Sequence, residues 1–164
     1  GEHRRGSLHN KSRLPRIPIE HACVSLGGAR RALDEVARQA VDKRRLGASA
    51  MVADDRAFQI ELGKLEAEWT ALRAGVRECA GALCDAIIAE ADDVPALTAQ
   101  LRSICAFATE RCLEIGGRAM RAAGAGAVLE TNVIQRVYRD LAVSAQHVMV
   151  SDAAYVGGGL AAIG

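Results

Sequence analysis

Residues 58–83 read FQIELGKLEAEWTALRAGVRECAGAL, and the spacing of the apolar side chains in this stretch decides the fold. Apolar residues recur every three or four positions, at Phe58, Leu62, Leu65, Trp69, Leu72, Val76, Cys79 and Leu83. This period places them along one side of an α-helix, whereas a strand would alternate at every second residue. With its flanks, the pattern predicts one helix of about 35 residues, on the order of 50 Å long. A helix of that length in a chain of 164 residues is typical of a helical bundle.

Three more stripes with the same period lie on either side of this stretch. They consist of Ala22, Leu26, Ala29, Leu33, Val36 and Ala40, then Leu97, Leu101, Ile104, Ala108 and Ile115, and finally Ile134, Val137, Leu141, Val148 and Tyr155. Their repeat is close to 3.5 residues (roughly), which suits helices that cross at shallow angles. The sequence therefore predicts an all-α fold, an antiparallel up-down four-helix bundle with long helices.

Residues that favour helix starts precede three of the stripes. They are Asp54 or Asp55, Asp92 or Asp93, and Thr131 or Asn132. Pro95 fits the first turn of the third helix. The glycines at 116, 117, 124 and 126 lack the preceding strand of a phosphate-binding loop, so we interpret residues 116–132 as a flexible connection between helices.

The chain divides into three predicted parts. Residues 1–16 contain five Lys or Arg and few apolar side chains, which favours a solvated linker over a basic arm for nucleic acid. Residues 17–158 form the predicted bundle, with Pro15 and Pro18 where its first helix begins. Residues 159–164, at the end of GGGLAAIG, are expected to be a loose tail.

Composition excludes several classes of partner and site. A net charge of +1 and only five aromatic residues (two Phe, two Tyr and one Trp) argue against nucleic-acid binding. No apolar run reaches the ~18 residues that span a membrane, and no signal peptide is evident, so we expect a cytoplasmic protein. The five cysteines form no CxxC motif and HExxH is absent, so we expect no metal site and interpret the cysteines as buried, reduced thiols.

The fourth stripe has a second face that carries charge. If residues 134–155 form one helix, Arg136, Asp140, Val143 and His147 share a side that is distinct from the apolar stripe. Arg136 and Asp140 would form an i,i+4 pair. Such pairs are usually solvated, and a histidine between helices is more often a packing residue than a catalytic one. The residue pattern alone leaves both interpretations open.

Other charged residues have an ordinary explanation by default. Glu130 could act as a base, but acids before a helix are favoured by its dipole. Arg44 and Arg45 could bind an anion, but cations at the end of a helix are favoured in the same way. We interpret the remaining acids as one solvated face, which comprises Glu61, Glu66 and Glu68.

Three segments resemble the C-terminal helical domain of the acyl-CoA dehydrogenase superfamily. In the order that this superfamily uses, they are LPRIPIEHACVSLGGARRALDEVARQAVDKR (residues 14–44), ICAFATERCLEIGGRAM (104–120) and NVIQRVYRDLAVSAQH (132–147). The likeness runs from about Leu14 to Tyr155. It implies a four-helix bundle that follows a helical domain and a β-domain, so we expect this chain to be a fragment of a larger flavoenzyme.

The last two segments are more similar to one branch of the superfamily. Acyl-CoA dehydrogenases often carry a catalytic glutamate in YEGTxxIQR, and the sequence VLETNVIQR (128–136) keeps Glu130 and IQR but lacks YEG. Flavin-dependent monooxygenases of the same fold have a short RAAGAxAV connection followed by LQRxxRDxxxxxxH. Residues 121–147 resemble that arrangement better.

The monooxygenase resemblance implies roles for individual residues. The histidine of that motif faces the flavin and supports its oxygen chemistry, a role that would fall to His147. Imidazole suits it because the ring donates a hydrogen bond and changes its proton state near neutral pH. Arg136, Arg139 and Asp140 would orient the helix or bind the anionic part of the cofactor.

The resemblance also implies a cofactor and partners. Arg44 and Arg45 lie near where family members contact flavin phosphates, although the usual RxxFG is absent. We expect FAD or FMN in the intact enzyme, no tight flavin binding by this chain alone, and a dimer or tetramer formed through the bundle. The N-terminal flavin and substrate domains would be further partners. Two alternatives are an acyl-CoA dehydrogenase with Glu130 as base and a non-enzymatic helical assembly module.

Overall fold

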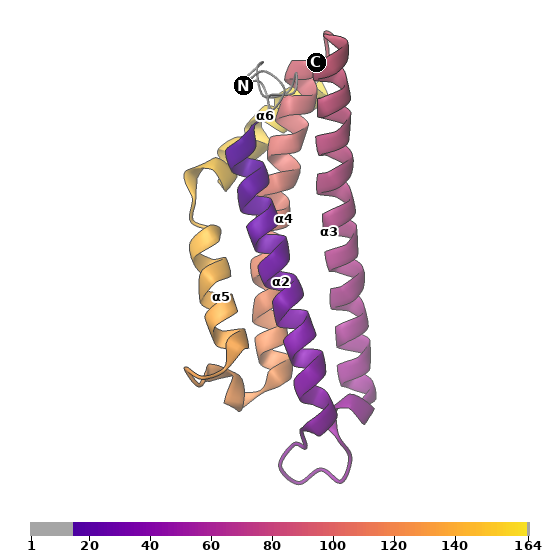
Figure 1. Cartoon of the computed structure of the whole chain (residues 1–164), viewed down its shortest axis with the longest axis vertical. Coiled ribbons are helices and arrows are strands. Elements are labelled where there is room, and N and C mark those ends of the chain that lie inside the picture. Colours follow the sequence, from indigo (N-terminus) through magenta and orange to yellow (C-terminus); the bar gives the residue numbers. More distant parts are fainter. Residues whose placement is uncertain (1–14, 164) are drawn as a thin grey trace, which may run out of the picture.

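The structure is a computed structural model that describes residues 15–163, and this part of the chain is all-helical, as predicted. Its α-helices are α2 (Arg16–Asp42), α3 (Arg56–Ala89), α4 (Val94–Ala123), α5 (Val133–Ser144) and α6 (Ala153–Ile163) (Figure 1). Three short 3-10 helices join them, η2 (Val52–Asp54), η3 (Ala125–Val128) and η4 (Val148–Val150). Most of the predicted linker, residues 1–14, lies outside the described residues.

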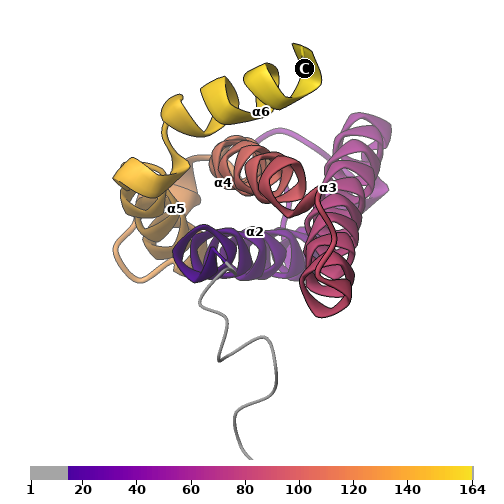
Figure 2. The same ribbon diagram turned by 90° about the horizontal axis from the view of Figure 1, so that it is seen from above.

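Helices α2 and α4 form the centre of the molecule. Figure 2 shows them side by side, with α3 on one flank, α5 on the other and α6 crossing the outside of α4. The pair α2 and α4 packs most extensively, while α3 and α5 share no contact. Successive helices from α2 to α5 run in alternating directions (Figure 1). Side chains at the contact between α5 and α2 therefore pack against the central pair of helices.

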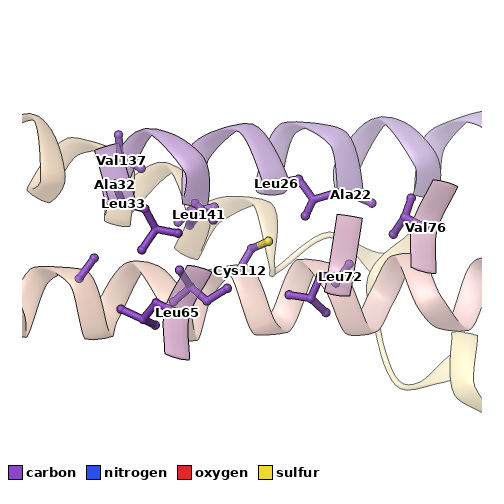
Figure 3. Close-up of a cluster of buried hydrophobic side chains, with 14 of the residues drawn as sticks. Ala22, Leu26, Ala32, Leu33, Leu65, Leu72, Val76, Cys112, Val137 and Leu141 are labelled. Carbon is purple, nitrogen blue, oxygen red and sulfur yellow. The ribbon is translucent and has the colours of Figure 1, made fainter. Parts of the chain in front are cut away.

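The predicted stripes supply the hydrophobic core. Leu33, Leu65, Leu101 and Ile115 are fully buried, and Leu141 is 2% exposed. Figure 3 labels Leu33, Leu65 and Leu141, which belong to one buried cluster and come from three different helices. Helix α3 spans 34 residues, close to the predicted length. The helical period of residues 58–83 thus identified the element correctly.

Helix starts follow the predicted capping residues. The Asp55 side chain accepts a hydrogen bond from the Ala57 backbone N–H (2.9 Å) at the start of α3. Asn132 accepts from the Ile134 backbone N–H (3.0 Å) at the start of α5. Asp93 occupies the cap position of α4 without a side-chain hydrogen bond, and a proline stands in the first turn of that helix. The Asp55 and Asn132 side chains thus pair with backbone donors that the first turn of a helix leaves unpaired.

The prediction of one helix through residues 134–155 is wrong. Helix α5 ends at Ser144, and His147 has an extended backbone (φ −74°, ψ 133°). The His147 Nδ1 atom accepts the Met149 backbone N–H (3.2 Å), which caps η4 and lets the chain turn across α4. The apolar period continues through the break because Val148, the first residue of η4, happens to keep it.

The predicted loose tail is also helical as far as Ile163. Helix α6 lies so close to α4 that an added Cβ at Gly158 would come within 2.2 Å of Ser103 Oγ. The Ser103 hydroxyl also donates to the Ala154 carbonyl oxygen (2.9 Å), which ties the two helices together. Glycine therefore permits close helix packing here rather than flexibility.

Gly116 and Gly117 lie inside α4, so the predicted flexible connection is confined to residues 124–132. Leu141 of α5 explains why a glycine is needed at Gly116. An added Cβ there would lie 2.7 Å from Leu141 Cδ1, and one at Gly28 of α2 would lie 3.0 Å from Leu141 Cδ2. The two glycines thus form a seat for Leu141, which we call the glycine seat. It allows α5 to approach both central helices.

The acids of α3 do not form one solvated face. Glu61 and Glu68 pair with Arg118 of α4 (2.7 and 3.1 Å). Glu66 points the other way and forms a two-bond pair with Arg30 of α2 (2.6 Å for each bond). The hydrogen bonds from arginine lower the pKa of both Glu61 and Glu66. These pairs lie on both sides of α3 and tie it to each of its neighbours.

The cysteines are only partly as predicted. All five are free thiols, and burial raises the pKa of Cys105 and Cys112 to about 12. Cys23, by contrast, is exposed on α2, so its interpretation as a buried thiol is wrong. In the described part of the chain, no helix is long and apolar enough to cross a membrane.

Gly116→Ala should destabilise the protein although alanine is the better helix former. The added methyl must displace buried Leu141, and overpacking of a core costs about 1–3 kcal/mol. The matched control is Gly63→Ala on α3, where a Cβ meets nothing within 4 Å and the gain in helix propensity is about 1 kcal/mol. Urea unfolding should therefore give opposite signs for the two variants. Equal stabilisation by both would show that the glycine seat is not tight.

Candidate functional site

His147 stacks on a second histidine that the sequence analysis did not select. The ring centroids of His147 and His21 lie 4.1 Å apart, with the ring planes tilted by 31°. His21 comes from the second turn of α2, and His147 from the cap of η4, just beyond the end of α5. The two rings meet because the glycine seat draws α5 against α2.

Two buried serines form a hydrogen-bonded cluster with His21. Ser25, one turn along α2, shares a hydrogen bond with Ser144 at the end of α5 (Oγ to Oγ, 2.9 Å). The Ser144 Oγ atom also lies 3.4 Å from His21 Nδ1. Ser25 is fully buried and Ser144 is 7% exposed, so each hydroxyl depends on this cluster for its partner. The serine pair ties the end of α5 to α2.

The two rings line an open pocket of about 520 Å³. It lies between α2 and the end of α5, and its lining residues are Glu20, His21, Val24, Asp140, Val143, Ser144, Gln146 and His147. Asp140 and His147 therefore do share a surface, but not for the predicted reason, since His147 lies outside the helix. The pocket contains two acids, two imidazoles and apolar walls. It can place a hydrogen-bond donor beside an apolar ligand.

The surroundings shift the pKa of His21. Burial lowers the pKa of His21, and the neighbouring His147 lowers it further, while Glu20 acts in the opposite direction. The His147 Nδ1 atom accepts the Met149 N–H, so in the neutral ring the proton resides on Nε2. His147 thus carries a single N–H donor in its neutral form.

Arg136 and Arg139 do not join this site. Both side chains are exposed on α5, and neither lines the histidine pocket. Among residues 15–163, no ion pair links Arg136 to Asp140, so the predicted i,i+4 pair is absent. Asp140 is left exposed at the rim of the pocket.

A second pocket, of about 340 Å³, lies at the other end of α2 and contains Arg44 and Arg45. Lys43 and Arg121 line it as well, together with the backbone around Gly124 and Gly126. No acid lines it, so it presents four cations. Sequence reasoning missed two of them, although both stand at helix C-terminal ends, where cations are favoured.

The cations of the second pocket are held by local contacts. Lys43 Nζ donates to the Ala123 carbonyl oxygen at the end of α4. Arg45 pairs with Asp55 (2.8 Å), while the Arg44 Nε donates to Met51 Sδ (3.4 Å). Gly124 has a positive φ of 76°, which favours glycine. An anion such as a phosphate fits this set, because the guanidinium groups are exposed and the adjoining backbone carries no Cβ at two positions.

The two pockets lie toward opposite ends of α2. His21 and Asp42 are 21 residues apart along α2, which corresponds to about 32 Å. Glu130 belongs to neither pocket and is exposed in the turn before α5. The structure thus brings His147 together with Asp140 and separates both from Arg44, Arg45 and Glu130. In the described range, no group of three or more potential ligands could hold a metal ion.

These features define a helical domain with an imidazole pocket at one end and a cationic pocket at the other. The sequence profile of the acyl-CoA dehydrogenase C-terminal domain matches residues 19–152. The chain therefore belongs to that domain family, as the three sequence segments predicted. No curated protein matches the sequence.

Solved structures share the fold. XiaF from Streptomyces sp., solved in complex with FADH2 and glycerol, superimposes with a TM-score of 0.82 at 23% identity, covering 89% of this chain and 37% of that one. The HsaA monooxygenase from M. tuberculosis gives 0.78 at 20%, and the 3-HSA hydroxylase from Rhodococcus sp. RHA1 gives 0.77 at 20%. Each of these two superpositions covers 89% of this chain and 38% of the solved chain. The chain thus spans a little over a third of the length of these structures.

Ser144→Ala should cost more stability than the double variant Ser25→Ala/Ser144→Ala. The single change leaves the buried Ser25 hydroxyl without a partner, at a cost of about 1–3 kcal/mol. The double change removes both hydroxyls, so no unpaired group is left buried. Chemical denaturation of the two variants measures the difference. Additive losses would contradict the serine pair.

Proposed function

We propose that this chain is the C-terminal domain of a larger flavin-dependent oxidoreductase of the monooxygenase type. The observation that carries the proposal is the position of His147, whose neutral ring carries one donor, Nε2–H, in an open pocket. Two findings support it. One is the family match, and the other is the similarity in fold to XiaF, which was solved with FADH2, and to the HsaA monooxygenase and the 3-HSA hydroxylase.

The residues of the histidine pocket suit a flavin face. A reduced flavin bound there would supply the activation of dioxygen, which no side chain can provide. His147 would direct Nε2–H at the reacting face and hold a proton there, while Val24 and Val143 would exclude water from one side. Asp140 would orient a polar group of the flavin or the substrate at the rim.

The position of Glu130 favours this proposal over a dehydrogenase. A base that removes a proton from an acyl substrate must reach the carbon beside the flavin. Glu130 is exposed in a turn and lines neither pocket. We therefore assign the flavin chemistry to His147 and none to Glu130.

We also propose that α2 to α5 act as a four-helix bundle that assembles with further copies. The cationic pocket would bind the phosphates of a flavin whose ring belongs to another subunit. The separation of about 32 Å along α2 between His21 and Asp42 supports this division. A dimer or tetramer would then complete each flavin site, with FAD the better fit because it carries two phosphates.

His147→Ala should impair the reaction of the full-length protein with oxygen. Without the Nε2–H donor, release of hydrogen peroxide from the reduced flavin should become faster by about tenfold or more. Rapid mixing of reduced, flavin-loaded protein with oxygen measures this rate. Gln146→Ala, which alters the same pocket without removing an imidazole, is the matched control. A rate unchanged by His147→Ala would exclude the proposed role.

Arg44→Ala/Arg45→Ala should weaken FAD binding to the full-length protein by about tenfold or more, and riboflavin binding much less. Each lost phosphate contact removes a charge-assisted hydrogen bond of roughly 1.5–3 kcal/mol. Arg73→Ala, an exposed arginine on α3, is the control. Titration by flavin fluorescence gives both affinities. Equal weakening for FAD and riboflavin would argue against phosphate binding in this pocket.

A further inference from the structure

We propose that His21 is a positioning residue for His147, and that the two imidazoles form a pair that takes up no more than one extra proton. This inference rests on the proposed function, because it specifies what keeps His147 in its donor form. His21 was not part of the predicted site. It lies on α2, whereas His147 follows α5, so only the packed fold brings the rings together.

The geometry couples the two rings directly. Their centroids lie 4.1 Å apart, a distance at which two positive charges repel strongly. The small tilt of 31° places one ring face over the other, so no side chain separates them. A first proton is tolerated by the pair, whereas a second would meet the charge of the first.

Two acids and no lysine or arginine line the pocket that holds the pair. These acids are Glu20 on α2 and Asp140 on α5, and Glu20 acts to raise the pKa of His21. The other lining residues are apolar, hydroxyl or amide side chains, and α4 contributes none of them. Burial lowers the pKa of His21, so this ring resists the proton more than a free histidine does.

Each ring is held by a different partner, and this gives the pair an asymmetry. The backbone N–H of Met149 occupies Nδ1 of His147, so a proton added to Nδ1 would break that hydrogen bond and the cap of η4. His21 Nδ1 faces the hydroxyl of Ser144, which can donate or accept. Proton uptake at His21 therefore leaves its local contact intact.

The test is an NMR titration of the histidine ring signals in this 164-residue chain. His147→Asn is the main variant, because the asparagine oxygen can still accept the Met149 N–H and preserve the cap. Removing the second ring should raise the midpoint at which His21 titrates. Gln146 lines the same pocket, and Gln146→Ala should leave the titration midpoint of His21 unchanged. An identical His21 midpoint in the wild type and in His147→Asn would overturn the proposal.

A second measurement separates a positioning role from a purely structural one. In the full-length enzyme, His21→Gln keeps a hydrogen-bonding side chain near Ser144 but cannot carry a charge. The acid limb of the pH profile for peroxide release should then move to higher pH, since nothing opposes protonation of His147. An unmoved limb would refute the positioning role. If the reduced, flavin-loaded wild-type enzyme did not react with oxygen, the proposed function would be refuted. The NMR titration would still decide whether the two rings are coupled.

Discussion

The contact of Leu141 with two glycines is the constraint on which the rest of the structure depends. Leu141 of α5 fills the space that side chains would otherwise occupy at Gly28 of α2 and Gly116 of α4. Close packing of this kind is costly to alter, because a well-filled core has no room for an added methyl. Helix α5 is thereby fixed against both central helices. The end of α5 then lies beside the second turn of α2, where the histidine pocket forms.

The break after α5 turns this packing into a site. Had the helix continued beyond Ser144, His147 would have followed the helical face that carries Asp140 and Val143. Instead, His147 caps η4 with its own Nδ1, and this single hydrogen bond both redirects the chain and fixes the ring proton on Nε2. Structure and chemistry therefore depend on the same atom. Helix α6, which packs closely on α4 through Gly158, holds the far side of the turn.

Sequence reasoning predicted the elements that depend on local period and capping, and failed where packing decides. The spacing from Phe58 to Leu83 gave α3, and Asp55 and Asn132 were among the predicted caps. Val148 keeps the helical period across the break, so apolar spacing could not reveal the end of α5. Gly116 suggested a loop because its reason, close contact with Leu141, involves a residue on another helix.

In the candidate site, too, the sequence predicted what depends on a local motif and missed what depends on packing between helices. His147 was selected from a motif, but its stacking partner His21 was not, because nothing in the local sequence of α2 marks it. Lys43 and Arg121 join Arg44 in one pocket only because α2 and α4 end at the same level. Contacts between residues that lie far apart in the sequence could be identified only from the folded domain.

The ring tautomer of His147 tests the central claim most directly. In ¹⁵N-labelled chain at a pH above the histidine titration, long-range proton–nitrogen correlation distinguishes a protonated Nε2 from a protonated Nδ1. We predict a single Nε2–H tautomer, since Met149 N–H occupies Nδ1. Gly116→Ala should loosen α5 and convert the signal to a mixture of tautomers. A Nδ1–H tautomer, or a mixture already present in the wild type, would contradict the account.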